Sequence, residues 1–276
     1  MTSPPEAPRR PHQHTEHGVV RDDPYHWLRD AGASEVLAHL AAERRWYDVA
    51  TGHLSSLTED LLAETVRRTP ATESSVRCER RHFSYYTRVP SGREHLQLLR
   101  DLNSRSPDPD TDPQVDSGFD NGSSGHELLL DAGDLAGTSS YVELGLTAVS
   151  PDERLLAYSF DVRGDEVYPL RFRDLATGED LPDEVPRTYY GGAWSASSDA
   201  FLYTVHDESY RPFQVRRHRL GTPPESDELV LQEDDPRFEL RVRQCRSGRL
   251  AVIWAVSPDA TEVWTVDLTR SDSSAL

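Results

Sequence analysis

The sequence predicts a mostly β protein, organised as a partial β-propeller that follows a helical N-terminal extension. The residues up to 75 carry apolar side chains at helical spacing, whereas residues 76–276 carry strand-like segments. Within the second region a strand, a polar turn, a second strand and a closing leucine recur about every 46 to 49 residues. Repeats of this length that are built from strands are typical of propeller blades, since one blade cannot bury its own faces.

Two helices are predicted in the N-terminal extension, residues 1–75, after a polar and proline-rich tail that ends near residue 20. The first begins near Ser34, a suitable N-cap, because apolar residues then share one face. These residues are Val36, Leu37, Leu40 and Ala41. In the second helix, Ser56 and Glu59 have the spacing of a capping box, and Pro70 ends the helix.

The blades are predicted over residues 76–276, and their clearest copy runs from Leu155 to Leu175. Similar copies end at Leu102, Leu220 and Leu268. Residues 104–126 interrupt the spacing with an acidic, low-complexity segment that cannot bury a core, so we interpret it as an inserted surface loop. Without this loop the copies have similar lengths, and we expect about four blades, the last of them incomplete.

Composition restricts the partners and the compartment. A net charge of -18 and a pI near 5.0 argue against nucleic acid and against an anionic membrane surface as partners. The longest apolar run, Leu250–Val256, is too short to span a bilayer, and the N-terminus does not resemble a secretory signal. Cys78 and Cys245 are isolated, with neither a disulfide framework nor zinc spacing, which predicts a cytoplasmic protein.

No residue pattern predicts a catalytic, cofactor-binding or metal-binding site, and no cofactor is expected. The nucleophile motif Gly-x-Ser-x-Gly is absent, and its nearest match, residues 122–125, lies in the acidic loop and is better interpreted as a linker. His12, His14 and His17 have metal-ligand chemistry, but a polar tail without fixed geometry makes a solvated segment the better interpretation.

Acidic turns of successive blades are the remaining candidates. Asp165 and Glu166 occupy one hairpin turn, and residues 207–212 occupy the next. Their carboxylates could line one end of a channel, but solvated turns or local salt bridges are the favoured interpretation. In the extension, residues 22–30 predict a turn at which Trp27 and Leu28 anchor the extension on the blades.

Several motifs, in the same order, resemble the N-terminal half of the prolyl oligopeptidase family of serine peptidases, and most closely its oligopeptidase B group. The resemblance covers about residues 8–268. It rests on Asp23-Pro24-Tyr25-His26-Trp27-Leu28-Arg29-Asp30, Ser150-Pro151-Asp152 with Leu156-Ala157-Tyr158-Ser159, Arg211-Pro212, Pro236-Arg237-Phe238 and Glu262-Val263-Trp264. Glu43-Arg44-Arg45 departs from the family pattern in the first helix.

The resemblance implies a seven-bladed propeller that caps an α/β-hydrolase domain, which follows the propeller and carries the catalytic triad. In such enzymes the propeller admits only oligopeptides and flexible segments, and oligopeptidase B relatives cleave after basic residues. This chain is then expected to be a truncated N-terminal propeller region, with about four of seven blades and no triad of its own. An oligopeptide substrate is expected only if the chain is joined to a hydrolase domain.

Two other functions remain open from the sequence. The chain could be a non-enzymatic propeller module that binds a peptide or a protein. It could also be one half of a split peptidase whose hydrolase domain is supplied by a separate chain.

Overall fold

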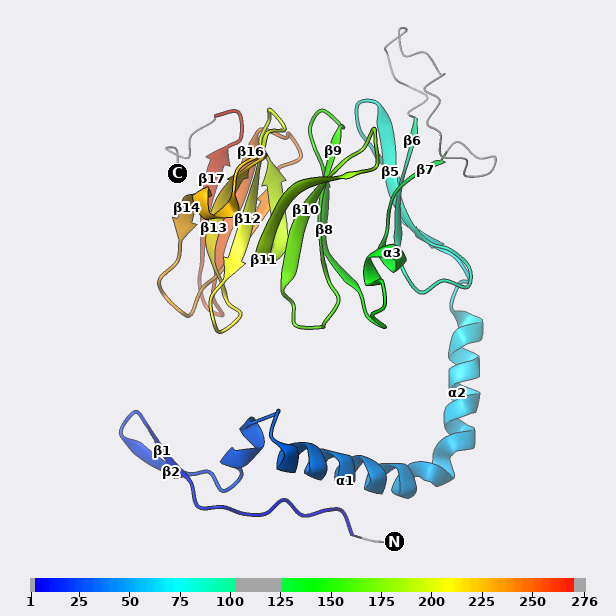
Figure 1. Ribbon diagram of the computed structural model, residues 1–276, viewed down its shortest axis with the longest axis vertical. Helices are drawn as coiled ribbons and strands as arrows, with labels where there is room; N and C mark the ends of the chain where they lie inside the picture. The colour runs from blue at the N-terminus through cyan, green and yellow to red at the C-terminus, as the bar shows by residue number, and fades with distance from the viewer. Residues whose placement is uncertain (1–2, 103–125, 271–276) are drawn as a thin grey trace. The chain divides into compact units, whose positions relative to one another are not determined.

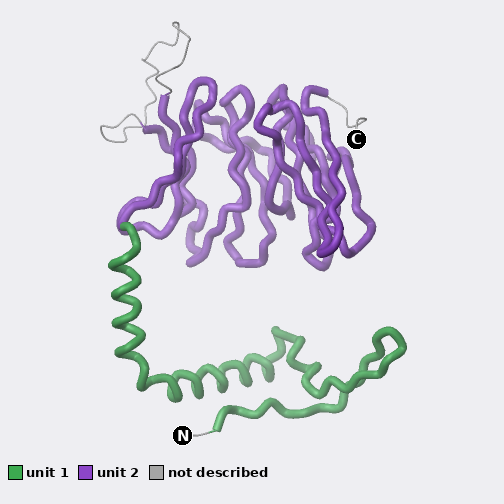
Figure 2. The backbone as a smooth tube through the Cα atoms, turned by 180° about the vertical axis from the view of Figure 1, so that it is seen from behind, with its two compact units in different colours: residues 1–70 green, residues 71–276 purple. Residues whose placement is uncertain are grey.

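The computed structural model describes residues 3–102 and 126–270 (Figure 1). The chain forms two compact units, residues 1–70 and residues 71–276 (Figure 2). The sequence predicts this division after residue 75. Glu73 and Ser74 already pair with a blade strand.

The first unit contains the two expected helices, joined almost without interruption. A hairpin of β1 (Gln13–Glu16) and β2 (Val19–Asp22) leads to the 3₁₀ turn η1 (His26–Arg29). Helix α1 (Ser34–Thr51) passes through η2 (Gly52–Leu54) into α2 (Ser55–Arg68). The predicted caps are wrong. Ala33 and Leu54 hold the N-cap positions without side-chain caps, because α2 continues the preceding 3₁₀ turn and does not start afresh.

Four blades follow in the second unit, and we number them in chain order. Blade 1 is a sheet of β5 (Phe83–Val89), β6 (Gln97–Leu102) and β7 (His126–Asp131), with the short β3 (Glu73–Ser74) and β4 (Cys78–Glu79) both paired to β5. A short helix, α3 (Ala132–Ala136), follows it. The predicted insertion 104–126 lies outside the described residues, except for His126, which begins β7.

The predicted strand repeats of blades 2 to 4 are confirmed. Blade 2 is formed by β8 (Glu143–Val149), β9 (Leu155–Asp161), β10 (Tyr168–Asp174) and the first part of β11 (Asp180–Trp194). Blade 3 is formed by the second part of β11, β12 (Ala200–His206), β13 (Pro212–Arg219) and, after the 3₁₀ turn η3 (Pro224–Ser226), β14 (Glu228–Gln232). Blade 4 is formed by β15 (Glu239–Gln244), β16 (Leu250–Val256) and β17 (Thr261–Asp267).

Strand β11 carries the chain from one blade into the next. Its residues up to Thr188 pair with β10, and from Thr188 onward they pair with β12. Arg187 and Gly191, which have φ of 59° and 87°, lie at irregularities in the β10 and β12 pairings respectively. A Cβ at position 191 would lie 2.4 Å from the carbonyl oxygen of Val242, so glycine permits blade 4 to approach here.

The hydrophobic core lies between the blades in three clusters. The first contains Tyr85, Leu130 and Tyr158 between blades 1 and 2, and the second contains Phe172, Trp194 and Phe201 between blades 2 and 3. The third joins blades 3 and 4 through β15 and β16. The sheets of the described residues do not close into a ring. The mostly β, partial propeller predicted from the repeats is therefore confirmed.

Candidate functional site

The turn between β9 and β10 holds the first pair of candidate carboxylates. Asp161, at the end of β9, accepts hydrogen bonds from the backbone N–H groups of Arg163, Gly164 and Glu166 at 2.7, 3.0 and 2.9 Å. Asp165 lies 3.5 Å from the Arg163 guanidinium. Asp161 therefore shapes the turn, and Asp165 is engaged locally.

Asp207 and Arg211 organise the corresponding turn of blade 3. Asp207 accepts hydrogen bonds from the backbone N–H and Nε of Arg211 at 3.1 and 2.9 Å. Burial raises the pKa of Asp207, but the hydrogen bonds from Arg211 outweigh it and hold this pKa below its usual value. Arg211 Nη1 also donates to the carbonyl oxygens of Glu233, Asp235 and Phe238. This turn therefore fastens blade 3 to the segment that enters blade 4.

A cluster of phenols surrounds Glu143 at the same end of these strands, since Glu143 pairs with Asp161 across β8 and β9. The Tyr141 hydroxyl donates to Glu143 Oε2 at 2.6 Å, and the Tyr190 hydroxyl donates to Oε1 at 2.9 Å. Tyr168 extends the network, with its hydroxyl 2.6 Å from that of Tyr190. The hydrogen bond to Glu143 raises the pKa of Tyr141 to about 12. These groups can hydrogen-bond a polar ligand, but they include neither a serine nucleophile nor a histidine base.

His206, at the end of β12, is a buried histidine in this region. It is only 4% exposed, and neither ring nitrogen has a hydrogen-bond partner within the described structure. Tyr189 packs edge-on against it at 4.7 Å between ring centroids, and Tyr210 lies at 6.1 Å. Burial, with a smaller contribution from Arg187, lowers the pKa of His206. These surroundings therefore favour the neutral form of the imidazole.

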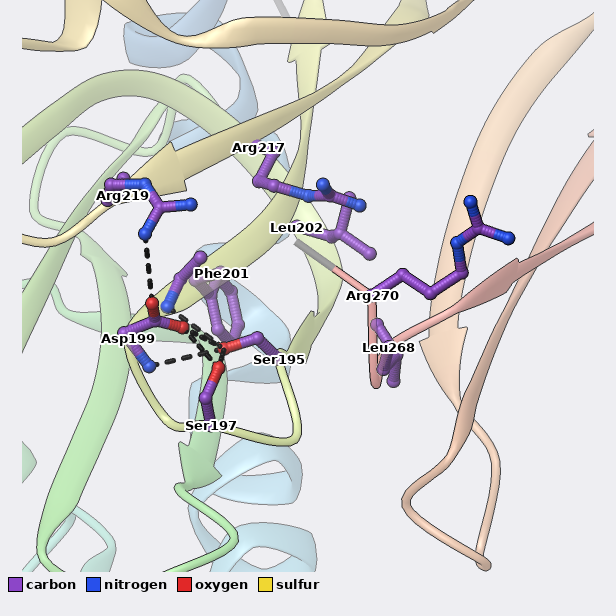
Figure 3. A pocket seen from close by; sticks show the side chains of 10 residues that line it. Ser195, Ser197, Asp199, Phe201, Leu202, Arg217, Arg219, Leu268 and Arg270 are labelled. Carbon is purple, nitrogen blue, oxygen red and sulfur yellow. Dashed lines mark hydrogen bonds and ion pairs between the residues drawn. The ribbon is translucent and has the colours of Figure 1, made fainter. Parts of the chain in front are cut away.

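The opposite end of blade 3 contains a pocket (Figure 3). The hydroxyls of Ser195 and Ser197 both donate to Asp199, and Arg219 lies 3.0 Å from the same carboxylate. These hydrogen bonds, chiefly that from Ser197, lower the pKa of Asp199. A serine nucleophile needs a neighbouring base, and the ten described residues that line this pocket include no histidine. The pocket therefore lacks the groups for acyl transfer.

The three histidine candidates of the N-terminal segment lie in the first unit. His12 stacks on His26 with ring centroids 3.5 Å apart, while His17 occupies the β1–β2 turn with a φ of 50°. No group of three or more His, Cys, Asp or Glu residues suited to a metal ion occurs in the described ranges. Residues 122–125 lie outside these ranges. The helices that the structure describes include none long and apolar enough to cross a membrane.

Trp27, from the recognisable motif 23–30, holds the N-terminal segment against α1. Its Nε1 donates to the carbonyl oxygen of Pro8 at 2.9 Å, and the Arg10 guanidinium lies 4.7 Å from its ring centroid. Arg10 also makes two hydrogen bonds to Glu35 on α1, both 2.6 Å. The motif thus orders the first unit. Anchoring of the extension on the blades stays a prediction.

This chain is similar to known proteins over nearly its whole length. Residues 5–276 match the family described as "Prolyl oligopeptidase, N-terminal beta-propeller domain". Protease 2 of Moraxella lacunata is 33% identical over 266 residues, which are 95% of this chain and 37% of that protein. Dipeptidyl aminopeptidase BI of Pseudoxanthomonas mexicana is 32% identical over 265 residues, with 95% and 36% covered.

A solved structure shows the same arrangement. Oligopeptidase B from Trypanosoma brucei, in a closed form with covalently bound antipain, superposes with a TM-score of 0.83 and 28% identity. The match covers 98% of this chain and 38% of that one. The chain thus spans little more than a third of the length of these relatives. With its blades, its opening motif and this match in agreement, the chain belongs to the prolyl oligopeptidase N-terminal β-propeller family.

Proposed function

We propose that this chain is the substrate-gating propeller portion of a serine-type endopeptidase that resembles oligopeptidase B. Joined to a hydrolase domain, it would allow only oligopeptides to reach the active site, and that domain would cleave them after basic residues. The extent of the match carries the proposal, because 95% of the chain aligns with only 37% of Protease 2. The chemistry would then belong to a region beyond the matched part.

The outer face of blade 4 carries apolar side chains, which supports the proposal that further chain or a partner covers it. On β16, Ala251, Ile253 and Ala255 are buried towards blade 3. The alternate residues on the other face are also apolar, namely Leu250, Val252, Trp254 and Val256. Beside them on β17, Val263 is 54% exposed. A strand that is apolar on both faces is typical of one that is covered on both faces.

Helix α2 supports the same conclusion for the first unit. It has no buried residue, yet it carries the exposed side chains of Leu57, Leu61, Leu62 and Val66. A helix with this much exposed apolar surface gains little stability without a partner. We propose that this partner is a hydrolase domain, which the extension would wrap.

Peptide cleavage tests the proposal directly. We expect the purified 276-residue chain to leave a fluorogenic arginyl peptide intact, since it matches a propeller domain and its sequence contains no Gly-x-Ser-x-Gly motif. A fusion to the remainder of Protease 2 from Moraxella lacunata should cleave this peptide, should be inhibited by a serine-directed reagent, and should spare a folded protein substrate. The remainder alone, as the control, should lose this size restriction.

Two results would contradict this function. One is turnover by the isolated chain that a serine-directed inhibitor abolishes. The other is a soluble, active fusion that digests the folded substrate as readily as the arginyl peptide. If cleavage instead appears on mixing the chain with a separately expressed hydrolase domain, the split-peptidase arrangement is favoured over a single chain.

We further propose a cytoplasmic location and no nucleic-acid partner. Both cysteines, Cys78 and Cys245, are free, as is usual in a reducing compartment. The net charge of -18 opposes binding to phosphate backbones. Cell fractionation of the source, together with a filter-binding assay using labelled DNA and RNA at low salt, tests both statements.

A further inference from the structure

His218 bridges two carboxylates at the joint between blades 2 and 3. Its Nδ1 lies 2.9 Å from Asp227 Oδ1, and its Nε2 lies 3.1 Å from Asp183 Oδ1. Asp183 belongs to the part of β11 that pairs in blade 2, whereas His218 lies on β13 and Asp227 precedes β14 in blade 3. The imidazole therefore connects the two blades.

The cluster is almost fully withdrawn from solvent. The side chains of His218 and Asp227 are 0% exposed, and that of Asp183 is 5% exposed. The Phe172 ring on β10 stacks against His218 with centroids 5.6 Å apart. A charge in such surroundings is costly unless its hydrogen-bonding groups are satisfied.

Neighbouring groups also donate hydrogen bonds to both carboxylates. The Tyr203 hydroxyl on β12 donates to Asp227 Oδ2 at 2.7 Å, and the Gly221 backbone N–H donates to Asp183 Oδ1. Arg216 Nη1 donates to the Asp227 carbonyl oxygen at 3.4 Å. The titratable and charged groups that face His218 from the packed elements are thus the two aspartates, with Tyr203 and Arg216 behind Asp227.

This geometry demands a particular protonation state. A neutral imidazole has one N–H group, so it can donate to only one of the two carboxylates, and its other nitrogen would place a lone pair against an oxygen. An imidazolium donates from both nitrogens and satisfies both partners. The positions of the acceptors therefore select the charged form.

We propose that Asp183, His218 and Asp227 form a pH-sensitive clasp that holds blades 2 and 3 together while His218 is charged and loosens in alkaline solution. Burial lowers the pKa of His218, but the hydrogen bonds that the ring donates to Asp227, and then to Asp183, raise it above its ordinary value. A raised pKa in the folded state means that the stability is complete below the unfolded pKa. It is lost as the pH rises through the folded pKa.

The clasp is independent of the proposed peptidase function, because it concerns one joint within the described blades. It would set the upper limit of pH at which this joint stays rigid. Each unit by which folding raises the pKa of His218 corresponds to about a tenfold gain in the folded-to-unfolded ratio on the acidic side.

Histidine titration and urea unfolding of the 276-residue chain test the clasp. With ¹⁵N-labelled histidine, NMR should show both His218 nitrogens protonated at about pH 7, with deprotonation at a higher pH than for free histidine. The resonance is assigned by its loss in His218→Gln. Between about pH 6 and about pH 9, the urea midpoint of the wild type should fall as this resonance titrates.

Asp183→Asn is the informative variant because it removes one charged acceptor and keeps the size of the side chain. We expect a lower His218 pKa and a weaker dependence of the urea midpoint on pH. Asp180→Asn, on the same strand, is the matched control. Asp180 pairs with Arg173 at 2.8 Å, so its loss should lower stability without changing the pH dependence above neutral.

A neutral His218 ring at about pH 7 would overturn the clasp, as would an Asp183→Asn variant with the pH dependence of the wild type. A protonated aspartate beside a neutral imidazole would give the first of these results. If His218→Gln does not fold, the Asp183→Asn difference spectrum assigns the resonance, and the two remaining measurements decide the question.

Discussion

Replacing Trp194 with phenylalanine tests how blades 2 and 3 are joined. Trp194 is 0% exposed in the blade 3 part of β11, and its Nε1 donates to the carbonyl oxygen of Ala148 on β8 at 2.8 Å. Its ring packs edge-on against Phe172 and Phe201, with centroids 5.6 and 5.2 Å apart. Trp194→Phe keeps an aromatic ring in the core but removes the donor and part of the volume.

The lost hydrogen bond and the lost ring volume together determine how far Trp194→Phe lowers the free energy of unfolding. A buried acceptor that loses its donor costs about 1–3 kcal/mol, here at the carbonyl oxygen of Ala148. The smaller ring leaves a void beside Phe172 and Phe201, which adds about 1 kcal/mol. We therefore expect Trp194→Phe to lower the free energy of unfolding by about 2–4 kcal/mol.

Urea unfolding followed by far-ultraviolet circular dichroism measures this loss without relying on tryptophan fluorescence. Trp254→Phe is the control, because Trp254 is only partly buried, on the outer face of blade 4, and should cost less than about 1 kcal/mol. If Trp194→Phe costs no more than Trp254→Phe, then neither the hydrogen bond nor the ring packing contributes as argued.

Three further changes test other features of the blades. In Gly192→Ala, the added Cβ would lie 2.4 Å from the Phe201 ring, so we expect a loss of about 1–3 kcal/mol in urea unfolding, and unchanged stability would contradict the close packing. In Arg211→Lys, the single ammonium group cannot hydrogen-bond to Asp207 and the three carbonyl oxygens together. We expect the free energy of unfolding to fall by about 1–3 kcal/mol and hydrogen exchange in residues 233–238 to become faster. His206→Phe removes two buried nitrogens without partners, so the urea midpoint should rise at neutral pH. Because burial depresses the pKa of His206, the wild type loses stability as the pH falls through the unfolded pKa, and the variant should lose less; an equal loss would exclude His206 as the source.

The strands were predictable because their signal is local. The predicted copy from Leu155 to Leu175 does begin with a strand, Leu155–Asp161, since a run of apolar and aromatic residues between turn residues marks a strand on its own. The closing leucines were less uniform than the repeat suggested. Leu175 and Leu268 are buried, whereas Leu102 is 60% exposed beside the inserted segment.

The helix caps were wrong because capping depends on what precedes the helix. Ser56 and Glu59 have the spacing of a capping box, but the preceding 3₁₀ turn continues directly into α2 and places Ser56 inside it. Likewise, the apolar face expected on α1 is mostly unburied within its unit. Only Val36 is buried, and Leu37 and Leu40 are more than half exposed.

Local sequence was enough to decide the fold class, the strand repeats, the family and the lack of a nucleophile motif, because each depends on residues close together in the chain. Tertiary structure alone decided which polar residues meet. Asp183, His218 and Asp227 come from two blades, and no spacing in the sequence brings them together. The physical reason is that burial and proximity across blades, which set hydrogen bonding and charge, arise only when separate strands pack face to face.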